Sequence, residues 1–99
     1  MTINKELDNT TLNVHIEGRI DTQTAPELEK SLKESIEDVT DLILDFTDVG
    51  YISSAGLRVI VTAQNWMDQK NGTMVIRNAV KNVQNIFKLT GFDTFLTLE

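Results

Sequence analysis

Two adjacent serines, Ser53 and Ser54, are the residues whose types and position most clearly allow chemistry. They precede the small residues Ala55 and Gly56, where a polar segment gives way to a helical pattern. A helix N-terminus presents free N–H groups and the positive end of the helix dipole, so it can hold a phosphate. Small neighbours leave a serine hydroxyl within reach of another protein's active site. The pattern therefore suits phosphorylation, which adds nearly two negative charges, but spacing alone favours a serine that only caps the helix.

Other kinds of chemistry find little support. His15 is the single histidine; it lies in an alternating segment opposite the apolar residues, and we assign it no role. The acidic residues match no calcium-loop spacing, and a chain without cysteine has neither thiol catalysis nor a zinc–thiolate site. No phosphate-binding Gly-x-x-x-x-Gly-Lys loop and no Gly-x-Ser-x-Gly elbow occurs. We therefore expect a protein that is not an enzyme, with no metal site and no cofactor.

Composition narrows the class of protein. Ninety-nine residues with 40% apolar content predict one domain over residues 1–99 with a modest core. A formal net charge of −6 disfavours direct binding to nucleic acid and favours a basic or protein partner. The apolar runs are too short to insert into a membrane, and the N-terminus lacks the apolar core of a signal peptide. These features, with the absence of cysteine, lead us to expect a cytoplasmic protein.

The first half of the chain predicts a hairpin and a helix. Residues 11–17 alternate between apolar and polar side chains and pair with a weaker strand over 3–7, and residues 18–21 end the hairpin. A helical stripe then runs through Leu28, Leu32, Ile36 and Val39. Thr24 and Glu27 have the spacing of a capping box, and Pro26 falls in the first turn.

The second half predicts two further strand–helix units. Residues 41–46 form a short apolar run typical of a central strand, and residues 47–52 are a polar connection to the helix that the serines open. A third strand (73–77) follows the Asn71-Gly72 turn, Asn78 is the expected N-cap of a third helix, Gly91 its C-cap, and 95–98 a last short strand. The order predicts an α/β fold, a mixed sheet of four to five strands with about three helices packed on it.

Three segments, in this order and spacing, resemble the STAS domain family, specifically its small anti-sigma factor antagonist (anti-anti-sigma factor) type. They are Gly18-Arg19-Ile20-Asp21, Leu42-Ile43-Leu44-Asp45-Phe46 and the run from Tyr51 to Ile60. The resemblance spans nearly the whole chain and implies a single STAS domain. In that family the serine or threonine two residues before the motif glycine accepts a phosphate, which corresponds here to Ser54, with Gly56 as the glycine.

The resemblance also implies a cycle of partners. In the family, the unphosphorylated protein binds an anti-sigma factor that is a serine kinase, and the sigma factor is released. The kinase phosphorylates the antagonist, which then dissociates, and a PP2C-type phosphatase restores it. Because the kinase supplies ATP and magnesium, the antagonist itself needs no cofactor.

The same resemblance suggests which residues meet the partner. The expected partner-binding set is Asp21, Thr22, Ser53, Ser54, Ala55, Gly56, Leu57 and Arg58. Asp21 matches a family aspartate beside the phosphorylation loop but suits helix capping equally well, and Arg58 is either a contact or an ordinary exposed arginine. Well-known antagonists often carry an aspartate before the phosphoacceptor, where this chain has Ser53, so Ser53 remains the less favoured acceptor.

Two other functions fit the same residues. One is a STAS subunit that does not switch, in a transporter or a signalling scaffold, and a neighbouring transporter gene would favour it. The other is a small-molecule or nucleotide-binding domain, which has the helix N-terminus as its sole support and which equilibrium dialysis against GTP and ATP would test.

Overall fold

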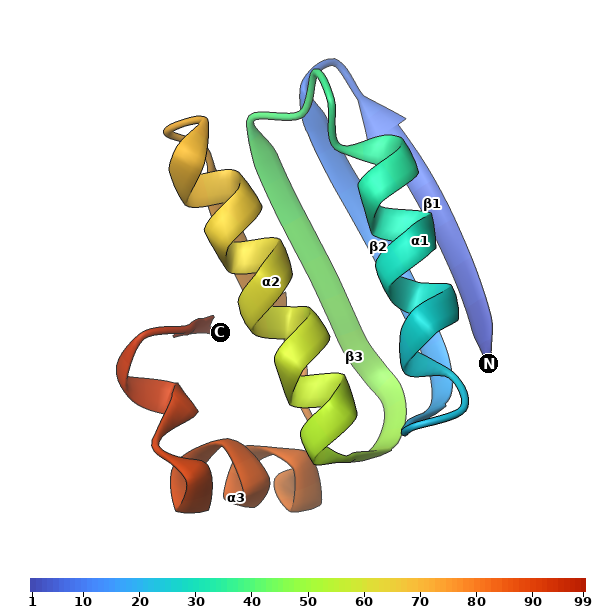
Figure 1. Ribbon diagram of the computed structural model, residues 1–99, viewed down its shortest axis with the longest axis vertical. Coiled ribbons are helices and arrows are strands. Elements are labelled where there is room, and N and C mark those ends of the chain that lie inside the picture. Colours follow the sequence, from blue (N-terminus) through green and yellow to red (C-terminus); the bar gives the residue numbers. More distant parts are fainter.

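The computed structural model describes residues 1–99 as a five-stranded mixed sheet with three α-helices (Figure 1). The strands are β1 (Thr2–Asp8), β2 (Thr11–Ile20), β3 (Asp41–Ile52), β4 (Thr73–Arg77) and β5 (Thr97–Leu98). The helices are α1 (Ala25–Ser35), α2 (Ser54–Gln69) and α3 (Lys81–Thr90), followed by the short 3₁₀ helix η1 (Phe92–Thr94). The predicted α/β class and order of elements are confirmed.

All three helices lie on one face of the sheet. The strands are ordered β1-β2-β3-β4-β5, with β1 antiparallel to β2 and each later pair parallel. Successive parallel strands are therefore joined by a helix that crosses over in one direction each time, and right-handed crossovers bring every helix to the same face. Figure 1 shows α1 and α2 lying along the sheet and α3 across its lower end. Between these layers lies a core of 24 buried residues, all of them apolar.

Strand β3 is twice as long as expected. The predicted polar connection over 47–52 is wrong, because β3 continues to Ile52. Its pairing with β2 shifts register twice, between His15 and Glu17 and between Gly18 and Arg19. Each shift leaves an extra residue on β3 and breaks the alternation of buried and exposed side chains. The buried positions of β3 are accordingly spaced by two and then by three residues: Leu42, Leu44, Phe46, Val49 and Ile52. The same pairing extends β2 through residues 18–20, where we expected the strand to end.

Helix α1 begins differently from the expected capping box. The Thr24 side chain forms no cap hydrogen bond to the helix. Instead the Asp21 Oδ1 atom accepts hydrogen bonds from the N–H groups of Gln23 (3.0 Å) and Thr24 (3.1 Å). The Thr24 hydroxyl donates to the carbonyl of Arg19 at 2.7 Å. The turn before α1 is therefore closed by Asp21, whereas Pro26 occupies the first turn as expected.

Helix α3 also begins two residues later than expected. Val80, not Asn78, is its N-cap residue. Asn78 has a φ of 62° and donates its side-chain amide to Asp45 Oδ1 at 3.3 Å. Asparagine tolerates this left-handed conformation better than most residues, so Asn78 makes the turn between β4 and α3. Gly91 ends α3 with a φ of 77°, as expected.

His15 joins two strands on the face of the sheet that carries no helix. It faces away from the buried Leu12, Val14 and Ile16, as expected, but it is half-buried and bonded. Its Nδ1 lies 3.0 Å from Asp45 Oδ2 and its Nε2 lies 2.8 Å from Asp48 Oδ2. Both ring nitrogens can donate to carboxylates only when the ring is protonated. The Asp45 hydrogen bond, followed by that of Asp48, accordingly raises the His15 pKa.

Asp45 connects β2, β3 and the turn after β4 through the same carboxylate. Its Oδ1 accepts from the Thr47 hydroxyl (2.6 Å), the Thr47 N–H (3.0 Å) and Asn78, while its Oδ2 meets His15. The Thr47 hydroxyl, with the His15 ring and these other donors, holds the Asp45 pKa well below its usual range. Asp45 is therefore an anion at all ordinary pH values, and it anchors the first register shift of β3.

The His15 interactions predict a stability that falls as pH rises. Because the folded pKa of His15 is raised, its contribution is complete below the unfolded value of about 6.5 and is lost as pH rises through the folded pKa. We expect the melting temperature of the wild type to exceed that of His15→Gln most at about pH 5.5 and to converge toward it by about pH 8.5. Thermal unfolding across this range measures the difference.

The matched control is Asp48→Asn, which keeps the imidazole and removes the carboxylate 2.8 Å from Nε2. It should weaken the pH dependence without abolishing it, since Asp45 and the Glu17 carboxylate, 3.5 Å from Nε2, still face the ring. A constant difference between wild type and His15→Gln at every pH would contradict this account.

Candidate functional site

The expected site forms where two neighbouring parallel strands end. The Ser53 N–H donates to the carbonyl of Ile20 at 2.8 Å, which ties the end of β3 to the end of β2. From these ends the chain enters α1 through residues 21–24 and enters α2 directly at Ser54. The N-termini of α1 and α2 consequently lie at the same edge of the sheet (Figure 1). This edge is where parallel α/β folds usually place their binding sites.

Gly56 sets how closely α2 approaches that edge. A Cβ atom at this position would lie 2.7 Å from Ile20 Cγ2, 2.7 Å from Ile52 Cγ1 and 2.9 Å from the Ile20 carbonyl oxygen. These distances are too short for any residue with a side chain. The absence of a side chain therefore lets the first turn of α2 rest directly on the ends of β2 and β3, which fixes the position of the serines.

The two serines have different roles. Ser53 is the N-cap of α2, and its Oγ accepts a hydrogen bond from the Gly56 N–H at 3.3 Å. Ser54 is the first residue of the helix; its side chain is exposed, and no hydrogen bond within the chain holds its hydroxyl. The capping interpretation therefore holds for Ser53, and it leaves the Ser54 hydroxyl free.

A shallow groove of about 180 Å³ runs between the first turns of α1 and α2. It is lined by Thr22, Ala25, Pro26, Glu29, Ala55, Arg58 and Val59. Three of the expected contact residues, Thr22, Ala55 and Arg58, thus share one surface. Gly56 is buried and Leu57 is only 5% exposed. These two residues are therefore not available on the surface for contact with a partner.

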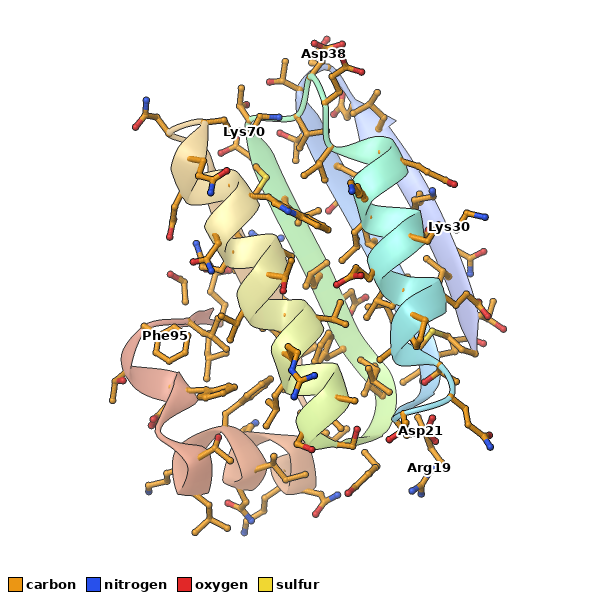
Figure 2. All side chains as sticks on the ribbon, viewed as in Figure 1. Arg19, Asp21, Lys30, Asp38, Lys70 and Phe95 are labelled. Carbon is orange, nitrogen blue, oxygen red and sulfur yellow. The ribbon has the colours of Figure 1, made fainter.

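Asp21 closes the turn before α1 on the same side. The N–H groups of Thr24 and then Gln23, together with the charge of Arg19, hold the Asp21 pKa below its usual value. Its Oδ2 lies 3.7 Å from Arg19 Nε, and Figure 2 shows the two side chains together at this end of the molecule. The capping interpretation of Asp21 is confirmed. Partner contact through its outer oxygen remains a proposal.

Arg19 is a residue of this region to which the sequence analysis gave no role. Its guanidinium lies 4.5 Å from the centre of the Tyr51 ring, a cation–π contact. Arg19 and Tyr51 become register partners in β2 and β3 only after the two register shifts, so the pattern of residue types gave no signal for the pair. Two basic residues, Arg19 and Arg58, stand at this edge together with the acidic residues Asp21, Glu27 and Glu29.

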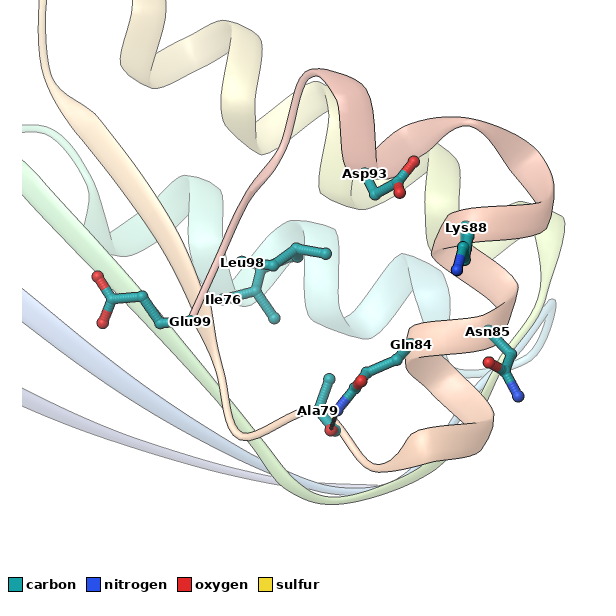
Figure 3. Close-up of a pocket in the computed structure, with 8 residues that line it drawn as sticks. All are labelled: Ile76, Ala79, Gln84, Asn85, Lys88, Asp93, Leu98 and Glu99. Atoms are coloured by element: carbon teal, nitrogen blue, oxygen red, sulfur yellow. Dashed lines mark hydrogen bonds between the residues drawn. The ribbon is translucent and has the colours of Figure 1, made fainter.

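Two other places in the structure are candidates for a ligand or metal site. The largest cavity, about 410 Å³, lies between α3, η1 and the end of β5 (Figure 3), and none of the expected site residues lines it. His15, Glu17 and Asp48 bring potential metal-ligand atoms within 4.8 Å of one another. The contacts of the His15 Nε2 atom with the Glu17 carboxylate (3.5 Å) and the Asp48 carboxylate (2.8 Å) already account for that approach. Neither place adjoins the serines.

Comparison with known proteins identifies the family. A model of the STAS domain matches residues 2–99, nearly the entire chain. The chain belongs to the STAS domain family. No helix of this STAS domain has the length and apolar character needed to cross a membrane.

The STAS relatives include named regulators of sigma factors. An anti-sigma-B factor antagonist of Listeria monocytogenes is 27% identical over 96 residues, covering 96% of this chain and 84% of the relative. The structure of an anti-sigma factor antagonist from Mycobacterium paratuberculosis has a TM-score of 0.87 at 24% identity, covering 98% of this chain and 83% of its own. The Bacillus cell fate determinant SpoIIAA in its phosphorylated form has a TM-score of 0.77 at 15% identity, covering 99% and 91%. These two structural likenesses confirm the fold.

The close approach at Gly56 predicts a costly substitution. Gly56→Ala should lower the free energy of unfolding by about 1–2 kcal/mol, because overpacking of about 1–3 kcal/mol exceeds the helix propensity gained, at most about 1 kcal/mol. Urea unfolding measures the loss. Gly50→Ala is the matched control, since no atom lies within 4 Å of a Cβ built there, and it should change stability by less than about 0.5 kcal/mol. Equal stability of the two variants would contradict the packing role of Gly56.

Proposed function

We propose that this STAS protein is an anti-sigma factor antagonist whose binding is switched by phosphorylation of Ser54. The unphosphorylated form binds an anti-sigma factor that is a serine kinase, and the sigma factor is thereby released. Phosphorylation of Ser54 by that kinase ends the interaction, and a PP2C-type phosphatase reverses it. The protein acts in the cytoplasm as a binding module and not as an enzyme.

The observation that carries this proposal is the difference between the two serines. Ser53 uses its oxygen to cap α2 and is half-buried, whereas Ser54 is exposed with an uncommitted hydroxyl. Ser54 also stands at the residue that the family motif designates, two positions before Gly56. A kinase active site can therefore reach the Ser54 hydroxyl without opening the helix or breaking its cap.

The comparisons support the class of partner. The relative from Listeria monocytogenes is named an anti-sigma-B factor antagonist, and SpoIIAA is named an anti-sigma factor antagonist with a structure in its phosphorylated form. The chain spans 84% of the Listeria protein and 91% of phosphorylated SpoIIAA. We extend from these proteins both the anti-sigma partner and the use of phosphorylation as the switch.

The charge at the groove explains how a single phosphate acts. The groove is lined by one acidic and one basic residue, Glu29 and Arg58. A phosphate on Ser54 would bring roughly −1.5 to −2 charges to this edge at neutral pH. A partner surface that fits the unmodified site would then meet added negative charge, and such mismatches cost several kcal/mol at an interface. Repulsion and bulk at Ser54 thus weaken binding without refolding the domain.

The test is to incubate the protein with its cognate anti-sigma kinase and ATP and to map the phosphate by mass spectrometry. We expect phosphate on Ser54 in the wild type and in Ser53→Ala, and none in Ser54→Ala. The kinase should bind phosphorylated protein at least about tenfold more weakly than unphosphorylated protein, a difference of about 1.4 kcal/mol. Calorimetry or surface plasmon resonance measures the two affinities.

Ser53→Ala is also a matched control for stability. It removes the Oγ that accepts from Gly56 N–H and should lower the free energy of unfolding by about 0.5–2 kcal/mol. Ser54→Ala, which removes no internal hydrogen bond, should leave stability nearly unchanged. Phosphate on Ser53 in the wild type, or equal kinase affinity before and after phosphorylation, would refute the proposal.

A further inference from the structure

We infer that Arg58 is the counter-ion of phosphorylated Ser54, so that the first turns of α2 contain both the modified residue and the group that binds the modification. This inference rests on the proposed function, because it concerns the phosphate that Ser54 would carry. It assigns to Arg58 a role within the chain, separate from contact with a partner. The ligand is a phosphate monoester dianion, and the binding group is a guanidinium.

The spacing of the two residues places them on one face of the helix. Ser54 and Arg58 both belong to α2 and are four residues apart, and both side chains are exposed. Residues at this spacing have Cβ atoms about 5–6 Å apart. An arginine side chain readily spans that separation, and its planar fork matches the oxygens of a phosphate.

Arg58 is also uncommitted. The ion pairs of the chain involve His15, Arg19 and Arg77, and none involves Arg58. Glu29 lines the same groove but is not within ion-pair distance of the Arg58 guanidinium. The guanidinium can therefore turn toward position 54 without losing an existing partner.

The other cation at this edge is already engaged. Arg19 lies over the Tyr51 ring at 4.5 Å and 3.7 Å from the Asp21 carboxylate. Moving it to Ser54 would break both contacts. Of the first-turn amides of α2, the Gly56 N–H is taken by Ser53 Oγ, whereas those of Ser54 and Ala55 are available to a phosphate. Arg58 adds a free cationic side chain one turn away on the same face of the helix.

This pairing makes phosphorylation change the surface at two positions. The phosphate adds negative charge at Ser54, and it also occupies Arg58, the one basic residue that lines the groove. A partner that meets the groove before phosphorylation finds an available guanidinium, and after phosphorylation it finds that guanidinium neutralised. The switch therefore removes an attractive group as well as adding a repulsive one.

The experiment installs phosphoserine at position 54 during translation, so that it does not depend on any kinase. The second pKa of the phosphate, ordinarily about 6, is followed by ³¹P NMR as a function of pH. Because Arg58 stabilises the dianion, we expect Arg58→Gln to raise this pKa by about 0.2–0.4 unit relative to the otherwise unchanged phosphoprotein. Arg58→Lys, which keeps the charge but loses the fork, should give an intermediate value.

Lys30→Gln is the matched control for the loss of one positive charge. Lys30 is exposed on α1, on the side directed away from α2 (Figure 2). Lys30→Gln should leave the phosphate pKa within about 0.1 unit of its value in the otherwise unchanged phosphoprotein, since solvent and salt screen distant surface charges. Equal shifts in Arg58→Gln and Lys30→Gln, or no shift in either, would overturn the inference. Failure of a kinase to modify Ser54 would instead refute the proposed function alone.

A second measurement compares stability in a four-protein cycle. Phosphoserine at position 54 should raise the melting temperature more when residue 58 is arginine than when it is glutamine, because the ion pair forms only with both groups present. The same cycle with Lys30→Gln should show no coupling. Coupling that is absent in the Arg58 cycle would overturn the inference even if all proteins fold.

Discussion

The contact between the first turn of α2 and the ends of β2 and β3 organises this molecule. At Gly56 the helix backbone approaches Ile20 and Ile52 so closely that a Cβ atom would lie 2.7 Å from each side chain. The Ser53 N–H completes the contact by donating to the Ile20 carbonyl. Because this arrangement consists of backbone and core atoms, the residues above it are held in place without using their own side chains. Ser54 and Arg58 are therefore free to interact with other molecules.

The two faces of the sheet differ in the interactions that hold them together. The helix-covered face is apolar throughout, and its cohesion comes from the burial of 24 residues. The uncovered face depends on polar interactions instead, with Asp45 linking His15, Thr47 and Asn78 across three neighbouring segments. These polar interactions stabilise the stretch of β3 that leads to the serines. Both faces thus contribute to the position of the same edge.

Much of the fold could be predicted from the sequence, because most elements follow a regular period. The alternation over residues 11–17 and the stripe Leu28, Leu32 and Ile36 lie where β2 and α1 are found. The length of β3 could not be predicted, because two register shifts replace its alternation with spacings of three residues. The pairing of His15 with Asp45 and Asp48 depends on that register and was missed with it.

The sequence indicated which residues form the candidate site, but it did not show the separate role of each residue. The motif around Ser54 and Gly56 indicated the STAS family correctly because its residues are consecutive. What spacing could not show was that Ser53 caps the helix, that Leu57 is buried, or that Arg19 stacks on Tyr51. Each of these depends on the direction of a side chain, which a pattern of residue types does not determine.

The order of the strands has a consequence for how the chain folds. Each strand pairs only with the strands that precede and follow it along the chain. The hairpin of β1 and β2 is local, whereas each parallel pairing must first close a helical crossover, as between Leu12 and Leu42, and such pairings form more slowly. The sheet can therefore grow one strand at a time from the N-terminal hairpin, and the edge that carries Ser54 can be assembled before the last third of the chain has joined it.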